Sequence, residues 1–248
     1  MKIVTLNLRY PAPGDGKNYF FNRLPLIVER IHQEAPDVLC FQEAMPESLQ
    51  ALRRELPAYA FFGVGREADY GGEACPIACR RETIALHAMD QFWLSETPRV
   101  PGSRYREQSI CPRICTWVKL YQPADGKKCY IVNTHLDHEF EAARTQGLTQ
   151  ILGLIKALEQ QEPLPLFLTG DFNLEPQDAP YALIRGSGLT DVTRDIPPTF
   201  HDFGRGPAMK IDYILTNRPS ECCDVTAWHE ERDGMFLSDH DAVALRWQ

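Results

Sequence analysis

Apolar residues along the chain follow two periods, which together predict many strands with a few covering helices. Short runs of β-branched and aromatic residues are typical of strands, and Gly or Pro pairs mark several turns between them. The predicted strands span residues 2–10, 37–43, 60–64, 77–80, 84–94, 116–120, 128–134, 165–169, 210–216, 224–228 and 242–247. Helical spacing predicts helices at 22–34, 46–56, 139–160 and 178–186, the first with Asn22 as N-cap and Pro25 in its first turn. No repeat or linker interrupts the pattern, which favours one domain over residues 1–248.

The stretch Pro165–Asn173 joins a strand pattern to polar chemistry. Its apolar run ends in Gly170, which we expect to let the chain turn tightly, and then come Asp171 and Asn173. Because α/β folds place ligands at strand ends, these two side chains are expected at a rim. Taken alone, the segment favours a strand followed by an Asx turn, with both side chains bonded to their own backbone.

Several other predicted strands also end in polar residues that strands do not need. These are Asn7, Glu43, His135 and Asp212, and Ser238–His240 stands just before the last strand. Each has a structural explanation when taken alone: a buried amide bonding a loop, a helix cap, a satisfied core histidine or a turn. Their recurrence at the same end of successive strands favours a common site.

The residue types at these ends suit metal-assisted attack on phosphorus. Glu43 offers the hard oxygen ligand that Mg²⁺ prefers, and such an ion neutralises phosphoryl oxygens. Asp239 lies beside His240, and Asp212 is placed to reach a histidine; carboxylate–imidazole pairs fix a tautomer and raise basicity. No Ser or Cys has a comparable setting, so direct attack by water is favoured.

The net charge and the absence of targeting signals bear on the substrate and on the location of the protein in the cell. The net charge of −8 disfavours nonspecific binding to nucleic acid, which takes many Lys and Arg against phosphates, although a local basic groove is compatible with it. Neither a signal peptide nor a membrane segment is visible, which predicts a cytoplasmic protein.

The eight cysteines include two similar pieces, Cys75–Cys79 and Cys111–Cys115. Two pairs suggest zinc, but three intervening residues in an extended segment place the sulfurs well apart. Reduced, partly buried thiols are therefore the favoured interpretation.

Six motifs, in order and spanning nearly the whole chain, resemble the endonuclease/exonuclease/phosphatase superfamily, the fold of pancreatic-type deoxyribonuclease. They are Thr5–Arg9, Phe41–Glu43, Asn133–His138, Gly170–Asn173, Ile211–Ile214 and Ser238–His240. The resemblance implies an α/β fold, a four-layer α/β/β/α sandwich of two mixed β-sheets flanked by helices. It also implies a metal-dependent phosphoesterase.

The resemblance also implies roles for individual residues. The metal, Mg²⁺ or Mn²⁺, would be held by Glu43 with Asn7 and Asp239. Asp171 would align the attacking water, and Asn173 would contact the phosphate. His135 and His240 would bind the phosphate or handle protons, with Asp212 and Asp239 orienting them.

Further pieces, Phe92–Pro98, Pro112–Trp117 and Thr199–Phe203, look like a bacterial subgroup of mostly uncharacterised phosphoesterases. Arg113 could clamp a phosphate bidentately or form a surface ion pair. His138 and His201 could shape the substrate pocket or simply be exposed loop histidines.

The leading hypothesis is a metal-dependent phosphodiesterase or phosphatase acting on a small, sugar-linked or lipid-linked phosphoester. The absence of a basic run with interleaved aromatics supports it. The alternatives are a metal-dependent nuclease acting on DNA or RNA and a catalytically silent binding protein on the same fold.

Overall fold

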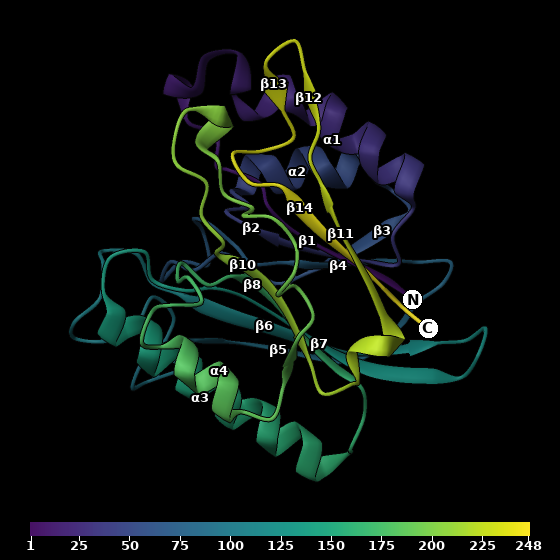
Figure 1. Ribbon diagram of the computed structural model, residues 1–248, viewed down its shortest axis with the longest axis vertical. Helices are drawn as coiled ribbons and strands as arrows, with labels where there is room; N and C mark the ends of the chain where they lie inside the picture. Colours follow the sequence, from purple (N-terminus) through teal and green to yellow (C-terminus); the bar gives the residue numbers. More distant parts are fainter.

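A computed structural model describes residues 1–248 and shows two six-stranded sheets packed face to face, with helices on both outer faces (Figure 1). The first sheet has the order β11 (Cys223–Trp228), β14 (Ala242–Trp247), β1 (Lys2–Asn7), β2 (Val38–Gln42), β4 (Ile77–Arg80) and β3 (Tyr59–Phe62). The second has the order β5 (Ala85–Trp93), β6 (Ile114–Gln122), β7 (Lys127–His135), β8 (Leu166–Asp171), β10 (Asp212–Thr216) and β9 (Thr190–Asp191). The first sheet is covered by α1 (Phe20–Glu34) and α2 (Pro46–Glu55), and the second by α3 (Glu141–Gln161) and α4 (Tyr181–Gly186). The expected four-layer α/β/β/α sandwich is confirmed.

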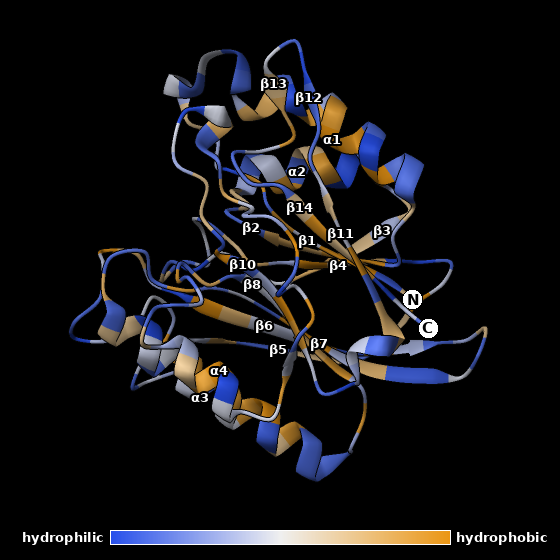
Figure 2. Ribbon diagram, in the orientation of Figure 1, coloured by the Kyte–Doolittle hydropathy of each residue, from blue (hydrophilic) through white to orange (hydrophobic).

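Strands buried on both faces explain the continuous apolar runs in the sequence. In β8, Leu166 and Leu168 belong to the cluster under α3, whereas Phe167 belongs to the cluster between the sheets. In β1, Val4 lies on the side of α1 and Ile3 faces the other sheet. Alternate side chains therefore enter different core layers, and no strand position needs to be polar. Figure 2 shows orange residues concentrated along the inner strands, whereas orange and blue residues alternate along the covering helices.

Strand direction gathers the polar ends at one edge. The pairs β1–β2 and β7–β8 are parallel, and in them Asn7 lies opposite Gln42 and His135 opposite Asp171. In the antiparallel pair β8–β10, Asp212 lies opposite Asp171. The residues predicted to share a site therefore meet because their strands are in register.

Details of the predicted elements needed correction. The first helix begins at Phe20 with Tyr19 as its N-cap, and the Asn22 side chain instead donates to the Gly16 carbonyl oxygen at 3.3 Å. As a result, Pro25 lies within the helix, beyond its first turn. The two-residue strand β9 and the hairpin of β12 (Glu231–Arg232) and β13 (Met235–Phe236) are too short to leave a periodic pattern. No helix combines the length and the apolar composition that crossing a bilayer requires.

A buried amide network joins the two sheets beneath the site. The Gln42 side chain donates to Thr5 Oγ1 at 3.0 Å within its own sheet and to Asn133 Oδ1 at 2.7 Å across the interface between the sheets. Asn133 in turn donates to the Phe41 carbonyl oxygen at 2.8 Å. These bonds fix β2 of one sheet against β7 of the other, just below the predicted site residues.

Arg23 is a fully buried cation that holds three loops together. Its guanidinium donates to the carbonyl oxygens of Leu8 at 2.9 Å, Asn18 at 2.5 Å and Leu237. Burial lowers the pKa of Arg23 to about 10, which still leaves it charged at neutral pH. Arg23 therefore connects the segment after β1 to the segment that precedes Ser238–His240.

Arg23→Met is expected to lower the free energy of unfolding by about 3–5 kcal/mol, because it leaves several buried carbonyl oxygens without a donor. Arg54→Met, on an exposed side chain of α2, should change it by less than about 0.5 kcal/mol. Urea unfolding followed by circular dichroism measures both. Equal stability of the two variants would contradict a structural role for the Arg23 network.

Candidate active site

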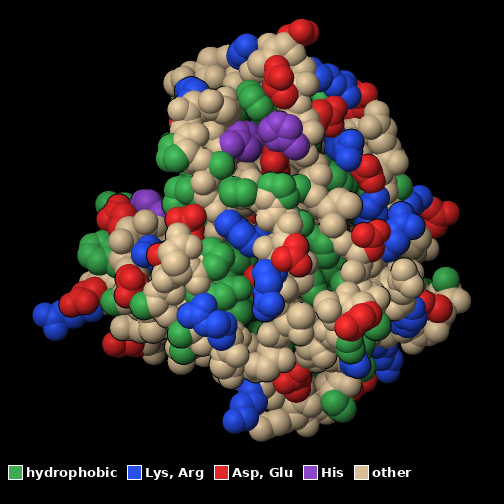
Figure 3. Space-filling view, viewed as in Figure 1, with side chains coloured by type: hydrophobic (Ala, Val, Ile, Leu, Met, Phe, Trp, Pro, Cys, Tyr) green, Lys and Arg blue, Asp and Glu red, His purple; other side chains and the backbone are tan.

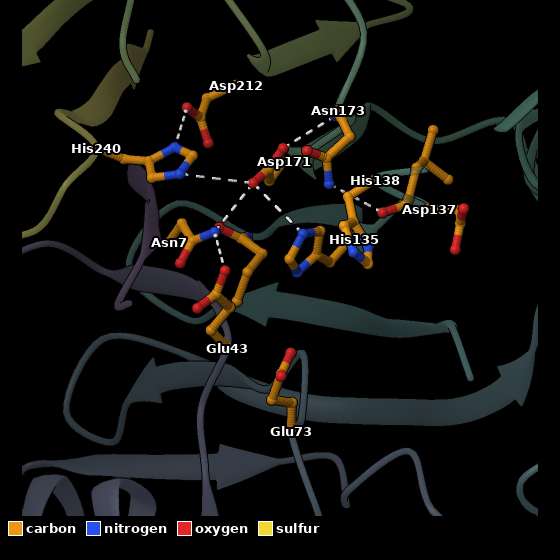
Figure 4. A network of polar contacts seen from close by, with 12 residues as sticks. Asn7, Glu43, Glu73, His135, Asp137, His138, Asp171, Asn173, Asp212 and His240 are labelled. Atoms are coloured by element: carbon orange, nitrogen blue, oxygen red, sulfur yellow. Dashed lines mark hydrogen bonds and ion pairs between the residues drawn. The ribbon is translucent and has the colours of Figure 1, made fainter. Parts of the chain in front are cut away.

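Asp171 lies at the centre of a polar network at the common edge of the strands (Figure 4). Its side chain is buried, and Oδ2 accepts a hydrogen bond from Asn7 Nδ2 at 2.9 Å. The Nε2 atoms of His135 and His240 lie 3.5 Å and 3.8 Å from the same oxygen. One carboxylate oxygen thus faces an amide and two imidazoles drawn from different strands.

The Asx turn and the site coexist in this segment. The backbone N–H of Asn173 donates to Asp171 Oδ1 at 2.9 Å, which is the turn considered as the structural alternative. The Asn173 side chain does not bond its own backbone but donates to the Leu136 carbonyl oxygen at 3.1 Å. The turn leaves Asp171 Oδ2 free for the site.

Gly170 does not form the tight turn that the sequence suggested. It lies inside β8 with φ +146°, and a Cβ there would meet the Thr134 carbonyl oxygen at 2.0 Å. The glycine is needed because β7 and β8 approach closely beside His135 and Asp171.

His240 is held as a cation by the carboxylates around it. Its Nδ1 lies 2.8 Å from Asp212 Oδ2, which also accepts a hydrogen bond from Thr199 Oγ1 at 2.6 Å. Burial alone would lower the pKa of His240, but the charges of Asp212, Asp239 and Asp171 outweigh it and raise the pKa well above its usual value. The predicted carboxylate–imidazole pair is present, and it leaves Nε2 to face the pocket.

The pKa of His135 shifts in the opposite direction from that of His240, whereas the pKa of Asp171 is raised as well. Burial and the positive charges of Arg113 and Arg66 lower the pKa of His135 well below its usual value. Burial and the charge of Asp212 raise the pKa of Asp171 to about 7. The site therefore places a neutral imidazole, a cationic imidazole and a carboxyl group that can exchange a proton near neutral pH around one point.

Glu43 and Asp239 supply the oxygen atoms that suit a hard divalent cation. Both line the pocket, and Glu43 has a left-handed backbone with φ 54°, a conformation that recurs where function constrains the chain. Burial raises the pKa of Asp239; the charge of His240 opposes this shift, and that of Glu43 adds to it. Two crowded carboxylates of this kind fit Mg²⁺ or Mn²⁺, whose charge would relieve their repulsion.

The Asn7 amide links Glu43, Asp171 and the segment after β1. Its Nδ2 donates to Glu43 Oε1 at 3.1 Å as well as to Asp171, while its Oδ1 accepts from the Arg9 N–H at 2.9 Å. With carboxylates on one side and an N–H group on the other, the amide orientation is fixed. Asn7 lies beside Glu43, as predicted, and its place among the metal ligands stays a prediction.

Arg113 lies within the pocket wall, so the alternative of a surface ion pair is wrong. It is 4% exposed, and its Nη2 lies 2.8 Å from His138 Nδ1, while its Nε is 3.9 Å from Asp137 Oδ2. Burial and the Arg113 charge lower the pKa of His138, although the charges of Asp137 and Glu139 oppose this shift. The His138 ring is half-exposed at the pocket and lies next to the positive charge of Arg113.

His201 does not line this pocket, which corrects its predicted place there. Its Nε2 lies 3.2 Å from Asp241 Oδ1, and its ring packs against Phe236. It lines a separate surface depression together with His229 and Asp241.

The pocket has a volume of about 510 Å³ and includes residues to which the sequence analysis assigned no role in the site. These are Arg9, Tyr10, Arg66, Glu73, Cys111, Phe200, Met209 and Ile211. Arg66 and Glu73 form a bidentate ion pair with distances of 2.7 and 2.8 Å. Arg9 and Ile211 lie in two of the six motifs, and Phe200 lies in the piece Thr199–Phe203. Arg66 and Glu73 flank a glycine turn that carries no catalytic pattern.

The cysteines form no disulfide, and all eight are free. None of them belongs to a group of metal-ligating side chains close enough to share an ion. Burial raises the pKa of Cys75 to about 12, which makes it a poor ligand and nucleophile.

This geometry and the deoxyribonuclease-type sandwich define the class: a metal-dependent hydrolase of phosphoric ester bonds. Residues 4–240 match the Endonuclease/Exonuclease/phosphatase family, and the chain belongs to that family.

Three proteins show how the similarity is distributed. An endonuclease/exonuclease/phosphatase from Bacteroides vulgatus is 31% identical, with a TM-score of 0.88 over 100% of this chain and 98% of that one. A mannosyl-6-phosphatase from Bacteroides thetaiotaomicron is 26% identical, with a TM-score of 0.88 over 100% and 99% of the two chains. Nocturnin from Drosophila melanogaster is 28% identical over 181 residues, which cover 68% of this chain but 26% of that protein.

Proposed function

We propose that the protein is a Mg²⁺- or Mn²⁺-dependent phosphatase that hydrolyses a small phosphate ester, such as a sugar phosphate, by direct attack of water. The observation that carries this proposal is the pocket itself: about 510 Å³ of polar space in which three arginines face the carboxylates of the site. A volume of this order is typical of small-molecule sites.

The surroundings of the pocket favour a small anionic substrate over a polynucleotide. Arg9, Arg66 and Arg113 supply positive charge within the pocket, while the chain as a whole carries −8. A nucleic-acid site would need such charge along an extended surface, because each bound phosphate releases counterions. The similarity to the mannosyl-6-phosphatase, which spans both chains almost completely, supports the same choice.

The side chains take the following roles in the proposed reaction. Asp171 accepts the proton of the attacking water, and cationic His240 donates a hydrogen bond to a phosphoryl oxygen. Asn173 and His135 complete the phosphate contacts at the pocket floor. Glu43 and Asp239 would hold the metal, which neutralises charge on the phosphoryl group when bound.

Glu43→Gln is expected to weaken Mg²⁺ binding by at least about 100-fold, because even side chains that only support a metal ligand change affinity by about 10–100-fold. Isothermal titration with Mg²⁺ and Mn²⁺ measures this change. Glu47→Gln, at the exposed start of α2, is the matched control and should bind as the wild type does. Unchanged affinity in Glu43→Gln would contradict the assigned metal site.

The substrate class is tested by phosphate release from a panel of sugar phosphates, a generic monoester, a generic diester, phospholipid head groups and plasmid DNA, each with Mg²⁺ or Mn²⁺. We expect sugar phosphates to be cleaved best and plasmid to stay intact. Asp171→Asn, purified in parallel, controls for contaminating phosphatase. Nicking of plasmid that falls steeply with salt would replace the proposal by the nuclease alternative, and the absence of turnover and of metal binding would leave the silent binding protein.

A further inference from the structure

Two histidines and an aspartate converge on the surface outside the catalytic pocket. His201 precedes the turn at 202–204, His229 follows β11, and Asp241 precedes β14. His201 Nε2 lies 3.2 Å from Asp241 Oδ1, and His229 Nδ1 lies 2.9 Å from the same oxygen. All three ligand atoms lie within 4.8 Å of one another.

The cluster is partly enclosed and its rings are supported. The side chains of His201 and Asp241 are 12% and 11% exposed, whereas that of His229 is 64% exposed. Phe236 packs against both histidine rings, with centroids 5.1 and 6.3 Å away. Figure 3 shows two histidines side by side at this face of the molecule, and the cluster borders a depression of about 670 Å³.

We propose that His201, His229 and Asp241 form a second metal site, which takes a divalent transition-metal ion of the Zn²⁺ class. A tetrahedral ion with ligands at about 2.0–2.2 Å needs neighbouring ligand atoms roughly 3.3 Å apart, close to the spacings seen here. Imidazole ligands select Zn²⁺, Ni²⁺ or Cu²⁺ over Mg²⁺, whereas the catalytic pocket offers carboxylate oxygens. The fourth position opens to the depression, where water completes the coordination.

Metal binding requires only a small change at His201. The N–H of Gly204 lies 3.3 Å from His201 Nδ1, but the same N–H donates to the His201 carbonyl oxygen at 2.8 Å. The Gly204 N–H therefore makes a bifurcated hydrogen bond, in which the contact with Nδ1 is the longer of the two. Its loss, when Nδ1 carries the proton and Nε2 binds the ion, leaves the turn intact.

The site would fix a segment that also supports the catalytic pocket. The backbone N–H of His201 donates to the Asp239 carbonyl oxygen at 2.9 Å, and that of Asp241 donates to the Thr199 carbonyl oxygen at 2.8 Å. A bound ion would tie this pair of segments to the end of β11. Zinc should therefore raise the melting temperature.

The test is zinc titration by calorimetry in full-length Glu43→Gln, which weakens the catalytic site and leaves the second one. Four proteins are compared: this background alone, and the same background with His229→Gln, with Asp241→Asn or with His32→Gln. His32 is an exposed histidine of α1 and serves as the control. Co²⁺ is a second probe, because a tetrahedral nitrogen-containing site gives intense visible bands and an octahedral oxygen site gives weak ones. Circular dichroism checks folding, and Asp241→Asn is a second variant.

We expect one zinc ion per chain in the background and in His32→Gln, with affinity reduced at least about tenfold in His229→Gln and Asp241→Asn. The intense Co²⁺ bands and the zinc-dependent rise in melting temperature should be lost together. Equal zinc affinity in all four proteins, or no uptake in the background, would overturn the second site. Neither outcome bears on phosphate release, so the proposed phosphatase function is judged separately.

Discussion

Asp171→Asn is expected to lower kcat by about 10³-fold and to change KM little, because the variant keeps the shape of the side chain but cannot accept a proton from water. Phosphate release from the best sugar phosphate measures both constants. Asp125→Asn, in the exposed turn between β6 and β7, is the control and should be fully active. Retention of more than a tenth of kcat by Asp171→Asn would exclude Asp171 as the general base.

The same substitution should change the pH dependence of stability in a defined direction. The pKa of Asp171 is about 7 in the folded protein, against an ordinary value of 3.8. The folded state therefore holds this proton more tightly than the unfolded chain, and the resulting stabilisation is lost as pH rises from about 4 to about 7. Relative to wild type, Asp171→Asn should gain stability across this range, measured by urea unfolding in EDTA. A constant difference would show that the carboxyl has an ordinary pKa.

The strand ends were predictable because two simple constraints act together. Strands buried on both faces need only apolar residues, so a polar residue that ends such a strand requires another reason. Parallel pairing then brings the ends of β1, β2, β7 and β8 to one edge. Asn7, Glu43, His135 and Asp171 therefore identified the site without any knowledge of side-chain directions.

Loop side chains were not predictable in the same way. His201 stands two residues after Thr199, which bonds Asp212, yet it lines another surface depression, where it lies beside Asp241. Arg66 and Glu73 meet across a turn at 67–72, and no periodicity encodes such a pair. Sequence motifs place backbone segments, whereas the direction of each loop side chain depends on local φ and ψ.

The sequence correctly indicated that glycine is needed at position 170, but the predicted reason, a tight turn, was wrong. Glycine before an acid suggested a turn, because glycine most often marks one. The structure instead places it within β8, against the Thr134 carbonyl oxygen. Only the spacing between neighbouring strands reveals this requirement, and that spacing is absent from the sequence of either strand.

Gly170→Ala is therefore expected to lower the free energy of unfolding by roughly 3 kcal/mol or more, since a Cβ 2.0 Å from a backbone oxygen forces β7 and β8 apart. The Thr134–Gly170 pair adjoins the His135–Asp171 pair, so the same displacement separates the two proposed catalytic groups. A shift of about 1 Å in such groups costs on the order of 10²-fold in rate.

Gly153→Ala is the matched control for this close-approach effect. Gly153 lies on the exposed face of α3, and a Cβ added there would meet no atom within 4 Å. Alanine should therefore stabilise the helix by about 0.5–1 kcal/mol without changing turnover. Urea unfolding and phosphate release on both variants separate the two effects. If Gly170→Ala kept full stability and activity, β7 and β8 would have to tolerate a wider spacing, and the alignment of His135 with Asp171 would not depend on it.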